Sequence, residues 1–198
     1  MVYRFKITLL EIKPEIWRLI EVPGTYSFWD LHVAIQDAMG WLDYHLHEFQ
    51  AATRDADTPV SIGIPEDESD DRIQAGWKVP IGEHFQKPGD SALYEYDFGD
   101  GWAHKIMLES IEPASPGTEY PRCVDGDRAC PPEDCGGEPG YNRLLDILAN
   151  PEDPEYEDMV DWLKNHAKNY HPYQPEVFDP QSVEFWDPEI RFQMMMDG

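Results

Sequence analysis

Residues 92–111 read ALYEYDFGDGWAHKIMLESI, and this stretch decides the fold. Apolar and polar residues alternate on both sides of the triplet at 99–101, as they do in strands with one buried face. An Asp-Gly pair at the centre of such a stretch is typical of a tight β-hairpin turn. We therefore predict a hairpin, in which a two-residue turn would place Asp97 opposite His104.

This predicted pair has two interpretations. A carboxylate that faces an imidazole fixes its tautomer and raises its pKa, which is half of an acid/base site or the outer shell of a metal site. Alternatively, Asp97 and His104 form a structural cross-strand pair. The same hairpin edge offers a candidate binding surface, formed by Tyr94, Tyr96, Asp100 and Trp102.

Working outward from the hairpin, periodicity and turn residues divide the rest of the chain. Strands are expected at 2–12, 16–22 and 44–52, and helices from Ser27 to Gly40, at 141–150 and at 154–168. Residues 54–71 and 112–140 are expected to be loops, residues 72–90 short pieces, and the last five residues mobile.

The mixed order of these elements, without repeated βαβ units, predicts an α+β fold with a mainly antiparallel sheet and helices packed against it. The length fits one domain over residues 1–198, with an acidic, proline-rich C-terminal region from about residue 151.

The charge of the chain is strongly one-sided. Forty Asp and Glu face fifteen Lys and Arg, which gives a net charge of −25. Such a surface repels phosphate backbones, so direct nucleic-acid binding is not expected, whereas a basic protein or a cation is a favoured partner. The alternative is that the acidity serves solubility alone. We see no signal peptide and no apolar run of the ~20 residues that span a membrane, so we expect a cytoplasmic protein without a membrane partner.

Two groups of residues have the chemistry of metal ligands. His45 and His47 would point to one face of a predicted strand, where they share a metal or serve as core residues. The segment 123–137, CVDGDRACPPEDCGG, places three cysteines within thirteen residues. These thiols suggest zinc, with His104, His166 or His171 as a fourth ligand, or else unligated core thiols or a redox pair.

The metal candidates are Cys123, Cys130, Cys135, His104, His45 and His47, with zinc as the candidate cofactor. The catalytic candidates are Asp97, His104, Glu133 and Asp134. An odd number of cysteines close together is no secreted disulfide framework and favours a reducing compartment.

Several motifs together resemble one known family. They are Ile16-Trp17-Arg18, Met39-Gly40-Trp41, HLHEF at 45–49, YEYDFGDGWAH at 94–104, and the segment 123–137 running into Pro139-Gly140-Tyr141. In these the chain resembles the plasmid pRiA4b ORF-three family. The resemblance implies an α+β domain of undetermined function, with genes associated with plasmids and mobile elements. It carries over no catalytic residue. In the family pattern the position of Cys135 need not be cysteine, which leaves Cys123 and Cys130 as the better metal pair.

Three functions follow as hypotheses. The leading one is a soluble acidic binding module for a protein or small ligand, with the hairpin edge and the cysteine segment as its surface. The second is a metal-dependent enzyme of hydrolase type that uses the His, Asp and Cys residues. The third is a DNA-associated or DNA-mimicking protein of mobile elements, whose acidic surface would occupy a basic DNA-binding protein.

Overall fold

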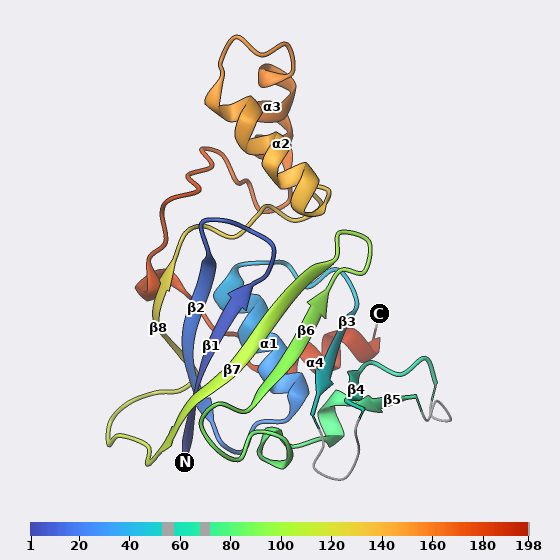
Figure 1. The fold of residues 1–198 in the computed structure, drawn as a ribbon, viewed down its shortest axis with the longest axis vertical. Helices are drawn as coiled ribbons and strands as arrows, with labels where there is room; N and C mark the ends of the chain where they lie inside the picture. The colour runs from blue at the N-terminus through green and yellow to red at the C-terminus, as the bar shows by residue number, and fades with distance from the viewer. Residues whose placement is uncertain (53–57, 68–71, 198) are drawn as a thin grey trace.

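One eight-stranded sheet runs through the residues that the computed structural model describes, which are 1–52, 58–67 and 72–197 (Figure 1). The strand order is β5-β4-β3-β6-β7-β1-β2-β8, and all neighbours are antiparallel except β4 and β5. The strands are β1 (Val2–Leu9), β2 (Ile16–Pro23), β3 (His47–Ala51), β4 (Val60–Gly63), β5 (Ile73–Ala75), β6 (Ser91–Tyr96), β7 (Trp102–Glu112) and β8 (Arg122–Asp127). The α-helices are α1 (Phe28–Met39), α2 (Gly137–Ala149), α3 (Tyr156–Asn165) and α4 (Pro188–Asp197). The predicted α+β class with a mainly antiparallel sheet is confirmed.

Two local hairpins form the centre of the sheet. Strands β1 and β2 pair with each other, as β6 and β7 do, and both pairings follow from the alternating sequence. The long strand β7 then pairs with β1 and joins the two hairpins. Along β1 the inner face carries Phe5, Ile7 and Leu9, all buried, while polar residues alternate with them on the outer face.

Helix α1 packs on the inner face of the sheet, and its ends are those that the sequence predicts. The Ser27 hydroxyl accepts a hydrogen bond from the Asp30 amide at 3.2 Å, and the Asp30 carboxylate accepts one from the Ser27 amide at 2.8 Å. This reciprocal capping satisfies two amides that a helix start leaves without partners. Gly40 ends the helix with φ of 92°, which favours glycine.

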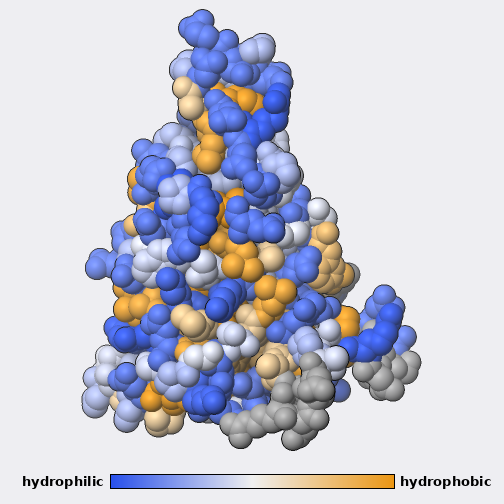
Figure 2. All heavy atoms as spheres, viewed as in Figure 1, coloured by the Kyte–Doolittle hydropathy of each residue, from blue (hydrophilic) through white to orange (hydrophobic). Residues whose placement is uncertain are grey.

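The C-terminal third of the chain first leaves the sheet and then returns to it (Figure 1). Helices α2 and α3 form a hairpin that stands away from the sheet in Figure 1. The chain then returns along residues 168–187, which we call the strap, and ends in α4 beside α1. Figure 2 shows a mostly hydrophilic face with small apolar groups between. Of the described helices, none is long and apolar enough to span a membrane.

Both predicted long loops contain a strand. Strand β4 lies within 54–71, and β8 lies within 112–140. Residues 53–57 and 68–71, on which part of the first prediction falls, lie outside the described residues. Strand β8 pairs with β2, which is far along the chain, so its local pattern does not reveal it. Strand β4 pairs with its sequence neighbours β3 and β5, but it is only four residues long and stands in an acid-rich segment.

Several boundaries also differ from the predictions: the strand expected at 2–12 ends at Leu9, and the helix expected at 154–168 is Tyr156–Asn165. The helix expected at 141–150 begins at Gly137, and the expected mobile end belongs to α4 as far as Asp197, with Gly198 outside the described residues. The strand expected at 44–52 begins at His47, so His45 lies in the loop before it. The two imidazoles therefore do not share a strand face.

The predicted register of the central hairpin is wrong. Tyr96 pairs with Trp102 and Tyr94 with His104, so five residues connect the strands and Asp97 does not face His104. The Asp97 side chain instead stabilises the connection, because its Oδ1 accepts hydrogen bonds from the amides of Gly99 at 2.9 Å and Asp100 at 3.3 Å. A carboxylate that bonds to backbone amides ahead of it favours such a turn over a tight two-residue one.

Candidate functional site

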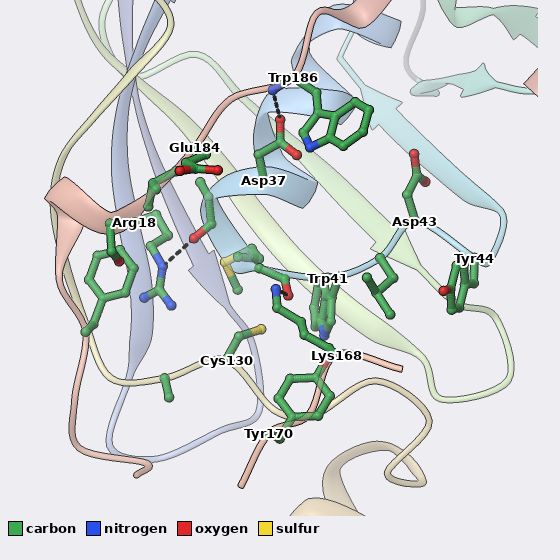
Figure 3. A pocket seen from close by; sticks show the side chains of 18 of the residues that line it. Arg18, Asp37, Trp41, Asp43, Tyr44, Cys130, Lys168, Tyr170, Glu184 and Trp186 are labelled. Carbon is green, nitrogen blue, oxygen red and sulfur yellow. Dashed lines mark hydrogen bonds between the residues drawn. The ribbon is translucent and has the colours of Figure 1, made fainter. Parts of the chain in front are cut away.

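A cavity of about 1090 Å³ lies between α1 and the strap (Figure 3). Its wall includes the end of α1, the loop 40–46, the segment at 129–130, parts of the strap and the first turns of α4. We call this cavity the strap pocket. The elements that enclose it come from both ends of the chain, so the pocket exists only in the folded protein.

Arg18 lies at one end of the strap pocket. It occupies the inner face of β2 and is only 1% exposed. Its Nε donates to the Ala38 carbonyl at 2.8 Å, and its Nη1 donates to two further carbonyls, those of Trp17 at 2.8 Å and Asp127 at 3.0 Å. The Phe178 ring covers the guanidinium with 3.5 Å between its centre and Cζ. Within the described parts of the chain, no carboxylate forms an ion pair with Arg18.

A second cation and a thiol lie near this end. Lys168 is the first residue of the strap. Its Nζ donates a hydrogen bond to the carbonyl of Gly40, the C-cap residue of α1. Cys130 is 8% exposed and also lines the pocket. Burial raises the pKa of its thiol, while the charges of Arg18 and Lys168 both act to lower that pKa. The positive fields of the two cations therefore overlap at Cys130.

The opposite end of the strap pocket is acidic, but its carboxylates are paired. Asp37 accepts from the Trp186 amide at 2.8 Å and from Arg191 of α4 at 2.9 Å. Burial raises the pKa of Asp37, which these bonds only partly offset. These contacts connect α1, the end of the strap and α4, so they hold the pocket closed on this side.

A buried polar network supports this acidic end. The Nε2 atom of His32 lies 2.8 Å from the Asp43 carboxylate. The other ring nitrogen of His32, Nδ1, lies 2.9 Å from the Tyr94 hydroxyl. Burial alone would raise the pKa of Asp43, but His32 holds it at about 2. Gln36 donates to the same hydroxyl at 2.9 Å, and the His47 ring stacks on His32 at 3.5 Å between ring centres. The network fixes Asp43 rigidly in the pocket wall.

A separate polar cluster lies at the rim of the strap pocket. His45 Nε2 lies 2.9 Å from the Asp134 carboxylate and 3.6 Å from that of Asp97. Ligand atoms of these three residues all lie within 4.8 Å of one another. We call them the rim cluster. In the described part of the chain, no other group of His, Cys, Asp or Glu side chains converges this closely.

Glu133 precedes Asp134 of the rim cluster in the chain and is buried. Its carboxylate accepts from the Leu42 amide at 2.6 Å and from the Tyr96 hydroxyl. Burial raises the pKa of Glu133. Because Tyr96 also accepts from the Tyr44 amide at 3.0 Å, both side chains position the loop that carries His45.

The turn of the central hairpin docks on the loop before α2, and this contact assembles the rim cluster. Asp100 accepts from the Gly136 amide at 3.0 Å. A Cβ atom at Gly137 would lie 2.5 Å from the Asp100 carbonyl oxygen, so glycine permits the close approach. The predicted proximity of the hairpin and the cysteine segment thus has a structural basis.

Several predicted site residues lie elsewhere. Tyr94, Tyr96 and Trp102 are 0%, 1% and 3% exposed, so they belong to the core and form no binding surface; among these candidates only Asp100 is half-buried. His104 is fully buried, and neither ring nitrogen has a hydrogen-bond partner among the residues described. Its side chain faces the core and lies apart from the rim cluster.

The three cysteines are free and do not converge on a metal site within the described chain. Cys123 lies on β8, while the other two lie in the loop that follows it. Burial raises the pKa of Cys123 to about 11 and that of Cys135 to about 12, which favours the thiol over the thiolate that zinc requires.

Sequence reasoning missed the most distinctive residue of the strap pocket. Arg18 stands in the inward-facing row of its strand, between Ile16 and Ile20. A charged residue at an inward position of a strand is rare unless it is paired or functional, so this signal was present in the alternation. Lys168 and the strap gave no such signal, because their place beside α1 is set by tertiary contacts.

Comparisons with known proteins agree with this fold. The model of the plasmid pRiA4b ORF-3-like proteins matches residues 1–182. Uncharacterized protein y4hQ of Sinorhizobium fredii (strain NBRC 101917 / NGR234) is 38% identical over 162 residues, which cover 81% of this chain and 80% of that protein. The crystal structure of the protein of unknown function MM3350 from Methanosarcina mazei Go1 is similar with a TM-score of 0.82 and 42% identity, covering 93% of this chain and 98% of that one. The chain therefore belongs to the family of plasmid pRiA4b ORF-3-like proteins.

Proposed function

We propose that this protein is a binding module for a small organic ligand and that the strap pocket is its binding site. The observation that carries the proposal is the cavity itself. Its volume of about 1090 Å³ is at the upper end of the ~300–1,000 Å³ that small-molecule sites occupy. Aromatic side chains and a few fixed polar groups line it, which is the usual composition of such sites.

The walls of the pocket are held in place from several sides. The Tyr170 hydroxyl accepts from the Glu133 amide at 3.1 Å, and the Tyr173 hydroxyl donates to the Cys130 carbonyl at 3.0 Å. The Ala129 amide donates to the backbone carbonyl of residue 175 at 2.9 Å. A preformed site loses less entropy on binding than a site that must first order, so these bonds favour a specific ligand.

A pocket-blocking variant tests the proposal. Ser182 lines the pocket on the exposed side of the strap, so Ser182→Trp places a large ring at its opening. Ser115→Trp is the matched control at an exposed position outside the pocket. A chemically diverse library is screened by thermal shift against the wild type and both variants. We expect ligands that stabilise the wild type and Ser115→Trp but not Ser182→Trp. Ligands that stabilise all three equally, or no ligand at all, would refute the proposal.

The rim cluster supports a second candidate function, a metal-dependent hydrolase. One imidazole and two carboxylates within 4.8 Å are a ligand set that fits zinc or manganese, and three protein ligands leave positions for water. A bound metal would lower the pKa of that water and so supply a nucleophile. In this arrangement Asp97 and Asp134 would be ligands, whereas the sequence suggested an orienting residue and an acid/base.

Metal titration distinguishes this candidate. Zn²⁺ and Mn²⁺ are titrated calorimetrically into the wild type, His45→Ala and a Cys123→Ser/Cys130→Ser double variant. The rim cluster predicts binding in the wild type and the double variant, weakened at least about tenfold in His45→Ala. Loss of binding in the double variant alone would move the site to the cysteines. Absence of binding to all three proteins would reject the metal hypothesis.

A basic protein partner, DNA mimicry and a cytoplasmic location stay predictions, because they rest on composition alone. Mimicry predicts that the protein competes with DNA for a basic DNA-binding protein, and that the competition weakens as salt increases.

A further inference from the structure

We infer that the ligand of the strap pocket carries a carboxylate or phosphate group, which binds Arg18 beside Cys130 and Lys168. This inference rests on the proposed function and adds the chemical class of the ligand. It starts from a buried cation that has no anion.

Arg18 has no ion-pair partner within the described residues, and the carboxylate charge that acts on it, that of Asp127, lies beyond ion-pair distance. The side chain is 1% exposed, and its hydrogen bonds go to the backbone carbonyls of Trp17, Ala38 and Asp127. Carbonyls satisfy N–H groups but do not neutralise a full charge. A buried cation is costly unless an anion lies close by, and desolvation accordingly lowers the pKa of Arg18. The other buried arginine, Arg128, does have such a partner, because it pairs with Glu176.

The geometry leaves one edge of the guanidinium available. Its Nε and Nη1 groups already donate to carbonyls, and the Phe178 ring covers one face of the group. The described residues give Nη2 no hydrogen-bond partner. Arg18 lines the pocket, and Figure 3 shows Cys130 between Arg18 and Lys168. Nη2 can therefore donate to an oxygen anion inside the pocket.

A second positive charge strengthens the same position. Lys168 donates only to the carbonyl of Gly40, and no carboxylate pairs with it in the described chain. Both Arg18 and Lys168 act electrostatically on the Cys130 thiol. An anionic group beside Cys130 would thus meet both cations, which a neutral group of the same shape would not.

Four acidic side chains line the pocket, and two of them, Asp37 and Asp43, are already paired. Asp37 and Asp43 are engaged by Arg191, while Asp179 and Glu184 come from the strap, and Figure 3 shows Glu184 between Arg18 and Asp37. Because Arg191 offsets part of the charge of Asp37 and Asp43, the cations without an ion-pair partner in the described chain, Arg18 and Lys168, are the positions where an anion is expected. The region between the two ends contains Trp41, so an aromatic body fits the space behind the anionic group.

Matched pairs of probes test the inference. Indole-3-acetate and indole-3-acetamide have the same ring and nearly the same shape but differ in charge, and phenyl phosphate and benzyl alcohol form a second pair. Dissociation constants are measured by calorimetry for the wild type, Arg18→Gln, Arg18→Lys and Arg143→Gln, the last a control at an exposed arginine outside the pocket. We expect at least one anion to bind about tenfold or more tightly than its neutral partner, because a charge-assisted hydrogen bond is lost in the neutral probe.

The pattern across variants completes the test. The preference for the anion should vanish in Arg18→Gln, persist in weakened form in Arg18→Lys and remain unchanged in Arg143→Gln. If indole-3-acetate binds more tightly than phenyl phosphate, the ligand's anionic group is a carboxylate. If phenyl phosphate binds more tightly, the group is a phosphate. If circular dichroism shows that the Arg18 variants do not fold, Lys168→Gln and high salt must each reduce the wild-type preference for the anion.

Three outcomes overturn the inference. They are equal binding of the anion and its neutral partner, anion binding that Arg18→Gln leaves intact, and no binding of any probe. The library screen separates these failures from failure of the proposed function. If neutral ligands bind the wild type but not Ser182→Trp, the pocket is a binding site without a preference for anions.

Discussion

Replacing His104 with phenylalanine is expected to make the protein less sensitive to mild acid. The His104 ring is fully buried, and the described residues provide no hydrogen-bond partner for either nitrogen. Burial lowers its pKa from 6.5 to about 4, with the Arg18 charge acting in the same direction and backbone groups of Tyr94 and Trp102 opposing it. Phenylalanine keeps a flat ring between Tyr94 and Trp41 and removes the titrating group.

The sign and size of the effect follow from proton linkage. Between pH ~6.5 and pH ~4 the unfolded chain binds a proton at His104 that the folded protein excludes. Acid therefore favours the unfolded state, and the free energy of unfolding decreases as the pH falls through this window. The pKa difference corresponds to about 3 kcal/mol, because one pH unit is worth about 1.4 kcal/mol. The variant should lack this contribution and keep those of all other groups.

Urea unfolding, followed by tryptophan fluorescence at several pH values across the window, measures the effect. The two curves of stability against pH should diverge by about 3 kcal/mol from the upper to the lower limit. His171→Gln, at an exposed position, should give the wild-type curve. Parallel curves for the wild type and His104→Phe would refute the burial argument and would reopen a catalytic or metal-binding role for His104.

Three further variants test contacts that hold the fold and the site together, each by urea unfolding. Ser27→Ala removes the cap of α1 and should cost about 1 kcal/mol; no loss would show that the cap is dispensable. Gly137→Ala should cost more than Gly117→Ala, because both have positive φ but only the first Cβ meets a backbone oxygen, at 2.5 Å; equal losses would contradict the steric argument. Arg191→Met leaves the buried Asp37 carboxylate without its cation and should cost about 2 kcal/mol, and a loss near zero would mean that α4 is held by apolar contacts alone.

Local sequence patterns predicted the elements that local forces determine. The capping residues of α1 and the alternation of β1, β2, β6 and β7 lie within a few residues of the contacts that they specify. Strand β8 was missed because it pairs with the distant strand β2, and β4 because its four residues stand in an acid-rich segment. The hairpin register was missed because the Asp97 side chain stabilises a longer connection than the Asp-Gly pair indicates.

The candidate site was predicted in part for the same reason. Asp97 was chosen from a hairpin register that proved wrong, and Glu133 and Asp134 from residue type. The docking of the hairpin on the loop before α2 is what brings Asp97 and Asp134 close to His45. The strap pocket could not be predicted, since it depends on where residues 168–187 cross the sheet. Its one local signal, an arginine among inward-facing apolar residues of β2, points to the pocket end for which the anion is proposed.

The pairing of β1 with β7 has a consequence for synthesis of the chain. Strands β1 and β2 are made before β7, which begins at Trp102 and pairs with β1 from His104 onward. At ~5–20 residues per second, translation of the intervening stretch takes on the order of 5 to 20 seconds. Throughout that interval one edge of β1 exposes unpaired backbone groups, and Phe5, Ile7 and Leu9 lack the core partners that β6 and β7 supply. The nascent chain at this stage is a natural client for a chaperone, which the finished sheet no longer needs.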